Sequence, residues 1–300
     1  MNQRLSLSTA ALLTVPPLLW AGNAVTGRLV SGLVPPITLN LLRWLLAFLI
    51  LLPLAGWVLR RGSPLWPHWK RYALLGLLGV GCYNALQYLA LKTSTPINVT
   101  LVAASTPVFM LGLGAIFFGQ RIHGRQWMGA VLSIAGVLLV LARGEPSHLA
   151  EVRFVPGDFY ILLATAAWAW YSWLLTRVEQ DPPELRASWS AFVMAQVVPG
   201  LAWSALFAGG EWAAAPQHID WGWPLALALA YVAIGPAIIA YRCWGAGVHR
   251  AGPNVAGFFS NLTPLFAAVL SAAFLGEPPR IYHAVAFVLI VGGILVSSRR

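Results

Sequence analysis

Apolar runs of membrane-spanning length, separated by short polar turns, dominate the sequence. A bilayer core needs about 20 apolar residues per helix. Ten stretches qualify, and we expect helices over residues 8–30, 36–58, 71–91, 95–118, 126–142, 157–177, 185–208, 223–247, 252–275 and 281–297. The first run lacks a small-residue cleavage site and nine more follow it, so we interpret it as a span and not as a signal peptide. The pattern predicts an all-α membrane protein with ten transmembrane helices.

The apolar pattern occurs twice along the chain. Thr106-Pro107 aligns with Thr263-Pro264 at a constant offset. The same offset pairs Pro96 with Pro253, Gly119 with Gly276, Gln120 with Glu277 and Gly136 with Gly293. A long period that occurs only twice does not indicate a solenoid, whereas duplicated units related by a pseudo-two-fold axis are typical of transporters. We therefore expect a first five-helix repeat over residues 1–147 and a second over residues 148–300.

The number of helices in each repeat decides how the repeats are related. Five is odd, so the second repeat enters the membrane from the opposite side, and the two repeats are inverted. Inverted repeats place a shared central cavity near the midplane of the bilayer. The connection over residues 144–157 contains Pro146, Pro156 and Gly157, which indicate a loop.

Composition and charge agree with a membrane environment. The chain is 59% hydrophobic and 9% charged, whereas soluble domains carry about 25% charged residues, so the lipid bilayer is its solvent. The formal net charge of +10 comes from basic residues in the turns, which argues against a nucleic-acid partner. One side would hold Arg4, Arg60, Arg61, Lys70, Arg71, Arg121, Arg125, Arg177, Arg186, Arg250, Arg299 and Arg300, and the other Lys92, Arg143, Arg153 and Arg280, with Arg28 near it. The positive-inside rule then places both termini in the cytoplasm.

Polar and aromatic residues recur at one-turn spacing on six of the predicted helices. Polar groups facing lipid are costly, so we expect these residues to face the cavity and bind substrate. The candidates are Trp20, Asn23, Tyr83, Gln87, Asn98, Trp168, Tyr171, Tyr241, Trp244, Asn254, Phe258 and Asn261. Two alternatives stay open for individual members, because Trp and Tyr near helix ends also form interfacial belts and Ser or Thr often bonds only to its own helix.

Two further patterns concern helix shape and packing. Pro107 and Pro264 lie inside predicted helices, where proline kinks the axis, so they are candidate hinges or else static bends. Gly129, Ser133 and Gly136 share one face of the fifth helix. Small residues allow close approach of membrane helices, either within the protomer or in a homodimer.

Charged residues inside the spans are few. Every Asp and Glu falls in a loop or at the end of a span, so coupling to an ion gradient through a membrane-buried carboxylate is disfavoured. Arg43 lies about seven residues into the second helix, where it would either bind a substrate carboxylate or a helix C-terminus, or extend to the outer surface. Arg242 is interpreted as an interfacial charge.

The chain carries none of the residue patterns that define an enzyme. Its six histidines lie in or beside loops, and Cys82 and Cys243 both fall inside apolar runs, so neither a metal site nor a disulfide is expected. A Walker lysine motif and a nucleophile elbow are missing too. We expect no enzyme activity, no cofactor and no metal, with a small-molecule solute as the partner.

Several motifs together resemble a known family. They are Trp20-Ala-Gly-Asn23, Pro35-Pro36 followed by Arg43, Thr106-Pro107, and Leu275-Gly-Glu277 running into Gly292-Gly293. Over essentially its whole length the chain resembles the drug/metabolite transporter superfamily, specifically its EamA-type ten-helix exporters, and within them the bacterial exporters of aromatic amino acids. The family normally has a Glu in both repeats, but here the first is Gln120, which puts any role that needs both acids in doubt. The resemblance implies export across the bacterial inner membrane by alternating access.

The functional hypothesis is export of aromatic or hydrophobic amino acids, extending to methionine or threonine, and of related small metabolites. A broad multidrug or cationic-compound exporter is the alternative, and the missing buried acid counts against it. A nucleotide-sugar exchanger would need more basic residues than Arg43 in the cavity. A membrane receptor or scaffold would need larger loops than this chain has.

Overall fold

The computed structural model describes residues 5–30, 32–93, 99, 102–142, 144–150, 155–275 and 280–298, and no β-strand occurs within these ranges. The first half (residues 1–147) contains α1 (Leu7–Leu29), α2 (Pro36–Ala55), α3 (Trp69–Leu75), α4 (Tyr83–Thr93), α6 (Thr106–Phe117) and α7 (Gly124–Leu141). The second half (residues 148–300) contains α9 (Pro156–Leu174), α10 (Pro183–Ala187), α11 (Trp189–Ala214), α12 (Trp223–Val232), α13 (Ala240–Ala251), α14 (Pro253–Ser260), α15 (Thr263–Leu275) and α16 (Ile281–Ser298). The short α8 (Ser147–Ala150) lies in the connection. The predicted all-α class is confirmed.

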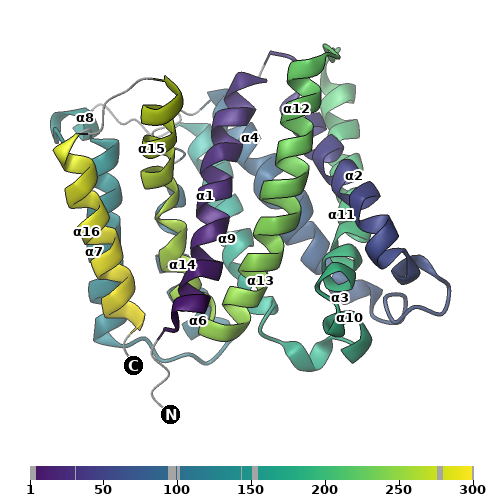
Figure 1. Cartoon of the computed structure of the whole chain (residues 1–300), viewed down its shortest axis with the longest axis horizontal. Coiled ribbons are helices and arrows are strands. Elements are labelled where there is room, and N and C mark those ends of the chain that lie inside the picture. The colour runs from purple at the N-terminus through teal and green to yellow at the C-terminus, as the bar shows by residue number, and fades with distance from the viewer. Residues whose placement is uncertain are drawn as a thin grey trace.

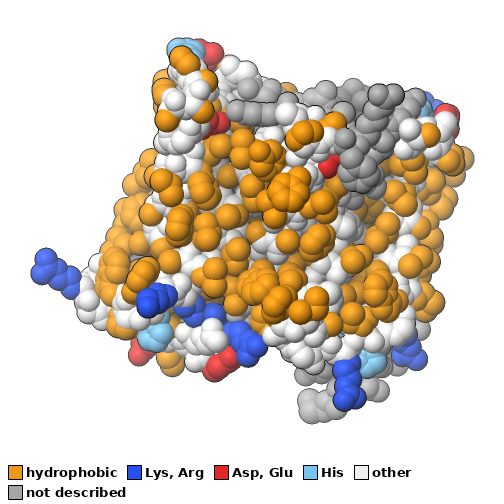
Figure 2. Space-filling view, turned by 180° about the vertical axis from the view of Figure 1, so that it is seen from behind, with side chains coloured by type: hydrophobic (Ala, Val, Ile, Leu, Met, Phe, Trp, Pro, Cys, Tyr) orange, Lys and Arg blue, Asp and Glu red, His pale blue; other side chains and the backbone are white. Residues whose placement is uncertain are grey.

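Several helical segments can cross a bilayer by their length and composition. They are Pro36–Leu59, Trp69–Ala90, Gly124–Leu141, Trp189–Ala214, Trp223–Ala251 and Ile281–Ser298. The helix Thr106–Phe117 is apolar but shorter. Hydrophobic side chains cover the middle of one face of the molecule, and Lys and Arg side chains gather along its lower edge (Figure 2). Helix α1 begins and α16 ends at that lower edge (Figure 1). The protein is therefore a multi-pass membrane protein.

Two of the long helices contain a π-helical segment in their middle. The segment Gly76–Cys82 joins α3 to α4, and the segment Ala233–Ile239 joins α12 to α13. Pro236 explains the second one, because its nitrogen has no hydrogen to donate to the preceding turn. π-Helical turns are rare and often occur at functional sites.

The local structure repeats with the sequence. Helices α7 and α16 begin at Gly124 and Ile281 and have equal lengths, so they are separated by 157 residues. The two π-helical segments and the starts of α6 and α15 are separated by the same 157 residues. Conformation as well as residue type is thus shared by the two halves.

The two halves are interleaved, and their contacts are reciprocal. Helix α1 of the first half packs against α13 and α15 of the second, and α9 of the second half packs against α4 and α6 of the first. Helix α2 contacts the π-helical segment of the second half, while α11 contacts that of the first half. The hydrophobic core is accordingly built from both halves at once.

The predicted small-residue face joins α7 to α16, which lie side by side (Figure 1). A Cβ atom added to Gly129 would lie 2.7 Å from the carbonyl oxygen of Gly293, and one added to Gly293 would lie 2.7 Å from the oxygen of Gly129. Gly136 approaches the oxygen of Ala286 in the same way, at 2.9 Å. Of the two alternatives that the sequence left open, this face is used for packing within one chain.

The sequence predicts that the two Thr-Pro pairs lie inside continuous helices, and this prediction is wrong. Helix α6 begins at Thr106 after a turn at Ala104 and Ser105, and α15 begins at Thr263 after α14 ends at Ser260. The reason is that a proline has no N–H to donate to the preceding turn and its ring clashes with the carbonyl four residues earlier, whereas it is tolerated in the first turn of a new helix. The helix stops and restarts at the same place in both halves.

Candidate solute-binding site

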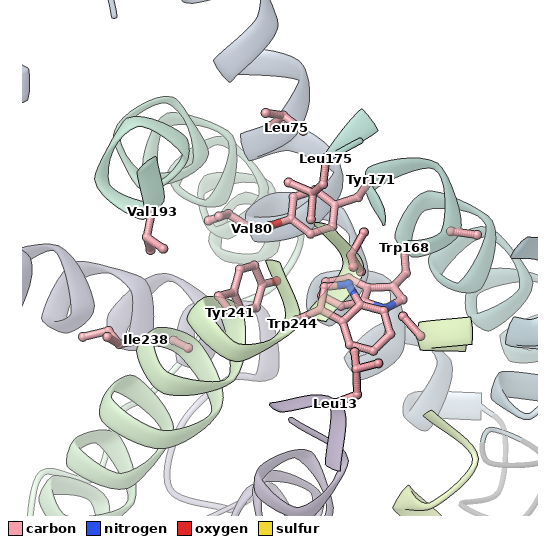
Figure 3. Close-up of a cluster of buried hydrophobic side chains, with 14 of the residues drawn as sticks. Leu13, Leu75, Val80, Trp168, Tyr171, Leu175, Val193, Ile238, Tyr241 and Trp244 are labelled. Atoms are coloured by element: carbon pink, nitrogen blue, oxygen red, sulfur yellow. The ribbon is translucent and has the colours of Figure 1, made fainter. Parts of the chain in front are cut away.

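Five of the predicted aromatic residues meet around a sixth, Trp168. Its ring centroid lies 5.1 Å from those of Trp20, Tyr83 and Tyr171, 5.3 Å from that of Trp244 and 5.6 Å from that of Tyr241. These six residues are called the aromatic cluster from here on. They come from α1, α4, α9 and α13, two helices of each half. Figure 3 shows Trp168 and Tyr171 of α9 pointing toward Tyr241 and Trp244 of α13.

Helix α9 supplies the centre of the cluster from its buried face. Trp168 and Tyr171 lie one turn apart and both are buried. The Tyr171 hydroxyl donates to Oε1 of Gln196 at 2.8 Å. Ser172 donates to the carbonyl of Trp168 at 2.8 Å and accepts from Nε1 of Trp244 at 3.0 Å. The buried rings of Tyr171 and Trp244 therefore have a defined orientation.

The π-helical segments hold the rings in place. The ring of Tyr171 lies over Gly79, where an added Cβ would come within 2.8 Å of it. The Tyr241 hydroxyl donates to the carbonyl oxygen of Gly79. Trp20 donates from Nε1 to the carbonyl oxygen of Pro236 at 3.4 Å. The π-helical turns thus accept hydrogen bonds from Trp20 and Tyr241, and these bonds orient the two side chains.

Helix α2 adds Trp44, which was not among the candidates, and Arg43, whose role the sequence left open. Trp44 is fully buried, and its ring meets that of Tyr241 edge-on with centroids 4.9 Å apart. The guanidinium of Arg43 lies 5.2 Å from the centroid of the Trp44 ring, and its Nη1 donates to Oδ1 of Asn84 at 3.1 Å. Arg43 is only 1% exposed. Of the alternatives that the sequence left open, extension to the outer surface is wrong, because the face of α2 that carries Arg43 packs against protein.

The remaining candidates of the first half lie in different surroundings. Asn23 is buried, and its Oδ1 has no hydrogen-bond partner among the described residues. Gln87 is half-buried on α4, one turn from Tyr83. Asn98 lies outside the described residues.

The candidates of α14 do not join the cluster through any ring contact between described residues. Phe258 is fully buried in the hydrophobic core. Asn261 donates to Oγ of Ser133 at 2.9 Å, which ties the end of α14 to α7. Asn254 is half-buried at the start of α14. The amide of Asn261 therefore serves helix packing, which its one-turn spacing in the sequence could not reveal.

Buried carboxylates are found at helix ends. Glu211 accepts from the backbone nitrogens of Ile37 at 3.1 Å and Thr38 at 2.8 Å, so it caps the start of α2. Asp158 accepts from the backbone nitrogen of Val155 at 2.8 Å at the start of α9. Asp181 pairs with Arg71 and Arg186 beyond the end of α9. These acids stabilise helix termini and a loop.

The apolar helices of membrane-spanning length define a multi-pass membrane protein. The chain belongs to the EamA-like transporter family, whose model matches residues 7–142 and again residues 155–299. The protein is thus a transporter and not an enzyme, and the double match agrees with the duplication predicted from the sequence.

Named relatives support the same class. The chain is 27% identical over 300 residues to the aromatic amino acid exporter YddG of Ancylobacter novellus, covering 98% of both chains. It is 28% identical over 298 residues to a probable amino-acid metabolite efflux pump of Salmonella typhimurium, covering 96% of this chain and 93% of that one. A solved crystal structure matches with a TM-score of 0.73 and 26% identity over 96% of both chains. The family resemblance drawn from the sequence motifs is confirmed.

Proposed function

We propose that the protein exports amino acids and related small metabolites across the bacterial inner membrane by alternating access. Its solutes are aromatic and hydrophobic amino acids, extending to methionine and threonine. Ten transmembrane helices would form two inverted five-helix repeats, with both termini in the cytoplasm. Two relatives named for amino-acid export, each matching nearly the whole chain, support this proposal.

The aromatic cluster is the observation that carries the proposal. Its rings already contact one another at centroid distances of 5.1 to 5.6 Å around Trp168. The ring of a solute would replace one of these contacts with another of the same kind, at little cost in free energy. Since the cluster draws on both halves, a movement of one half against the other would separate its rings.

A network of charged side chains joins the two halves at one end of the molecule. Arg71 of α3 donates to Asp181 from Nε at 2.6 Å and from Nη2 at 3.2 Å, and Arg186 of α10 donates to the same carboxylate at 2.9 Å. Helices α3 and α10 lie at the lower end of the molecule (Figure 1). We expect this network to close the cytoplasmic side and to break when that side opens.

Transport would not require protonation of a membrane-buried carboxylate. The oxygens of Glu211 accept hydrogen bonds from α2, including one from the Thr38 hydroxyl at 2.9 Å, and Asp181 is held by two arginines. Both acids are therefore engaged in contacts that hold a helix start and a loop together. The driving force is then the concentration gradient of the solute or exchange for another solute.

Efflux from proteoliposomes tests the proposal. Vesicles with the purified full-length protein are loaded with labelled phenylalanine, methionine or threonine, with and without a pH gradient. We expect efflux of these amino acids that is indifferent to the gradient. Trp168→Phe should slow it about tenfold, because the smaller ring loses contacts with its neighbours.

The matched control is Trp223→Phe, since Trp223 is 81% exposed at the start of α12. It should leave efflux unchanged. Robust movement of a lipophilic cation without efflux of any amino acid would overturn the proposal and favour the cationic-compound exporter. Efflux that depends on the pH gradient would show that the argument from the carboxylates is wrong.

A further inference from the structure

A buried arginine that has no counter-charge among the described residues lies beside the aromatic cluster. Arg43 is the eighth residue of α2, about 10 Å along the helix from its start. No salt bridge to it is found among the described residues, and its Nε has no hydrogen-bond partner there. Burying a charge without a partner is costly, and such groups inside membranes are usually functional. Its position therefore requires an explanation beyond packing.

A second arginine of the chain, Arg71, shows how a guanidinium binds a carboxylate in this protein. Arg71 binds both oxygens of Asp181 through its Nε and Nη2 edge. Arg43 is held differently, because its Nη1 donates to Asn84, and on its Nε edge the Nε itself has no partner among the described residues. That edge has the fork geometry that binds a carboxylate through two parallel hydrogen bonds.

Other buried polar atoms without a partner among the described residues accompany Arg43. On α2 they are Nε1 of Trp44, the adjacent residue, and Oδ1 of Asn40, one turn earlier. Asn23 of α1 adds a third, and it shares a face with Gly27, which approaches the ring of Tyr88 on α4. Donors and acceptors of this kind match the two charged groups of an amino acid.

The binding position is continuous with the aromatic cluster. From Arg43 the path runs 5.2 Å to the ring of Trp44, 4.9 Å on to that of Tyr241 and 5.6 Å on to that of Trp168. A solute with a carboxylate at one end and an apolar ring at the other could therefore contact both.

We propose that Arg43, oriented by Asn84, binds the carboxylate of the transported solute. The solutes are then aromatic or aliphatic carboxylates, whether zwitterionic or anionic, and amines without a carboxylate are excluded. This inference rests on the proposed function in taking the solute to be transported, but the binding site itself can be tested without transport.

Equilibrium binding provides that test. Three probes share one ring and differ in their charged groups: phenylalanine, 3-phenylpropionate and 2-phenylethylamine. Binding to the purified full-length protein is followed by tryptophan fluorescence and by the ligand-induced rise in Tm. We expect phenylalanine and 3-phenylpropionate to bind and 2-phenylethylamine not to bind. Arg43→Gln should weaken binding of both carboxylates about thirtyfold or more, and Arg43→Lys should restore only part of it.

Two controls separate binding from folding. Arg242→Gln removes an exposed arginine that lies over the ring of Trp189, so it should leave binding unchanged. The Tm of ligand-free Arg43→Gln should equal or exceed that of the original protein, because the variant removes a buried charge without a counter-charge. A lower Tm with unchanged carboxylate affinity would assign Arg43 a structural role and overturn the inference.

The remaining outcomes distinguish this inference from the proposed function. Binding of 2-phenylethylamine as tight as that of phenylalanine, or no binding of either carboxylate, would overturn the role of Arg43. Carboxylate binding that depends on Arg43, without efflux from proteoliposomes, would uphold the site and overturn the exporter. If Arg43→Gln and the original protein export phenylalanine equally fast, the exporter is upheld and the role of Arg43 is overturned.

Discussion

The carbonyl oxygens of Gly79 and Pro236 occupy corresponding places in the two π-helical segments, 157 residues apart, and each accepts a hydrogen bond from an aromatic side chain of the other half. Tyr241 of the second half donates to Gly79, and Trp20 of the first half donates to Pro236. Each half therefore supplies a turn that holds a ring of its counterpart. This exchange couples the aromatic cluster to the relative position of the two halves.

The bond from Tyr241 to Gly79 should contribute to stability. Tyr241→Phe removes the hydroxyl but keeps the ring, so the free energy of unfolding should fall by about 1 kcal/mol. The Tm of the purified protein should drop by a few degrees, and phenylalanine efflux should slow. Tyr160→Phe is the control, because Tyr160 is exposed near the start of α9. Equal Tm values for the two variants would show that the bond to Gly79 does not stabilise the fold.

Adjacent glycines of α16 should respond very differently to the same change. Gly293→Ala would bring a Cβ within 2.7 Å of the backbone oxygen of Gly129, which can move only if α7 and α16 separate. We expect the free energy of unfolding to fall by about 2 kcal/mol or more, with a clearly lower Tm. Gly292→Ala meets no atom within 4 Å and should be neutral or stabilising. Similar Tm values for both variants would contradict the packing of α7 against α16.

The network around Asp181 should be sensitive to loss of its carboxylate. Asp181→Asn leaves Arg71 and Arg186 without their shared acceptor, and breaking such a buried pair costs about 3 kcal/mol. The Tm should fall, and a cysteine introduced near Tyr72 should react faster with a thiol reagent added from the cytoplasmic side. Glu179→Gln removes an acid that is 64% exposed and should change neither quantity. Unchanged labelling of the Asp181 variant would argue against a gate.

Glu211 should stabilise the start of α2 without coupling transport to protons. Glu211→Gln weakens the cap on the backbone nitrogens of Ile37 and Thr38, so stability should fall by about 1 to 2 kcal/mol. Efflux should remain indifferent to a pH gradient. Asp220→Asn, at a half-exposed side chain paired with His218, is the control for stability. A gradient dependence that Glu211→Gln abolishes would instead identify Glu211 as the coupling residue.

Much of the fold and part of the site could be predicted from the sequence. Apolar runs of spanning length predict helices, because a backbone in lipid must satisfy its own hydrogen bonds. The repeat predicted from Thr106-Pro107 and Thr263-Pro264 also relates the two π-helical segments. The one-turn spacing of Trp168 and Tyr171 predicts that they face the interior, and the structure places their rings against that of Tyr241.

Other features could not be read from the chain. Arg43 and Trp44 face inward although α2 is apolar nearly all round, and Asn261, in the turn after α14, binds Ser133. In a membrane, lipid and protein interior are equally apolar, so hydrophobicity does not mark which face packs inward. The sequence by itself determined the helical class, the membrane environment, the duplication and the family. Only the tertiary structure decided that the halves interleave, that α7 pairs with α16, and that Arg43 is buried beside the aromatic cluster, because these depend on contacts between residues far apart in the chain.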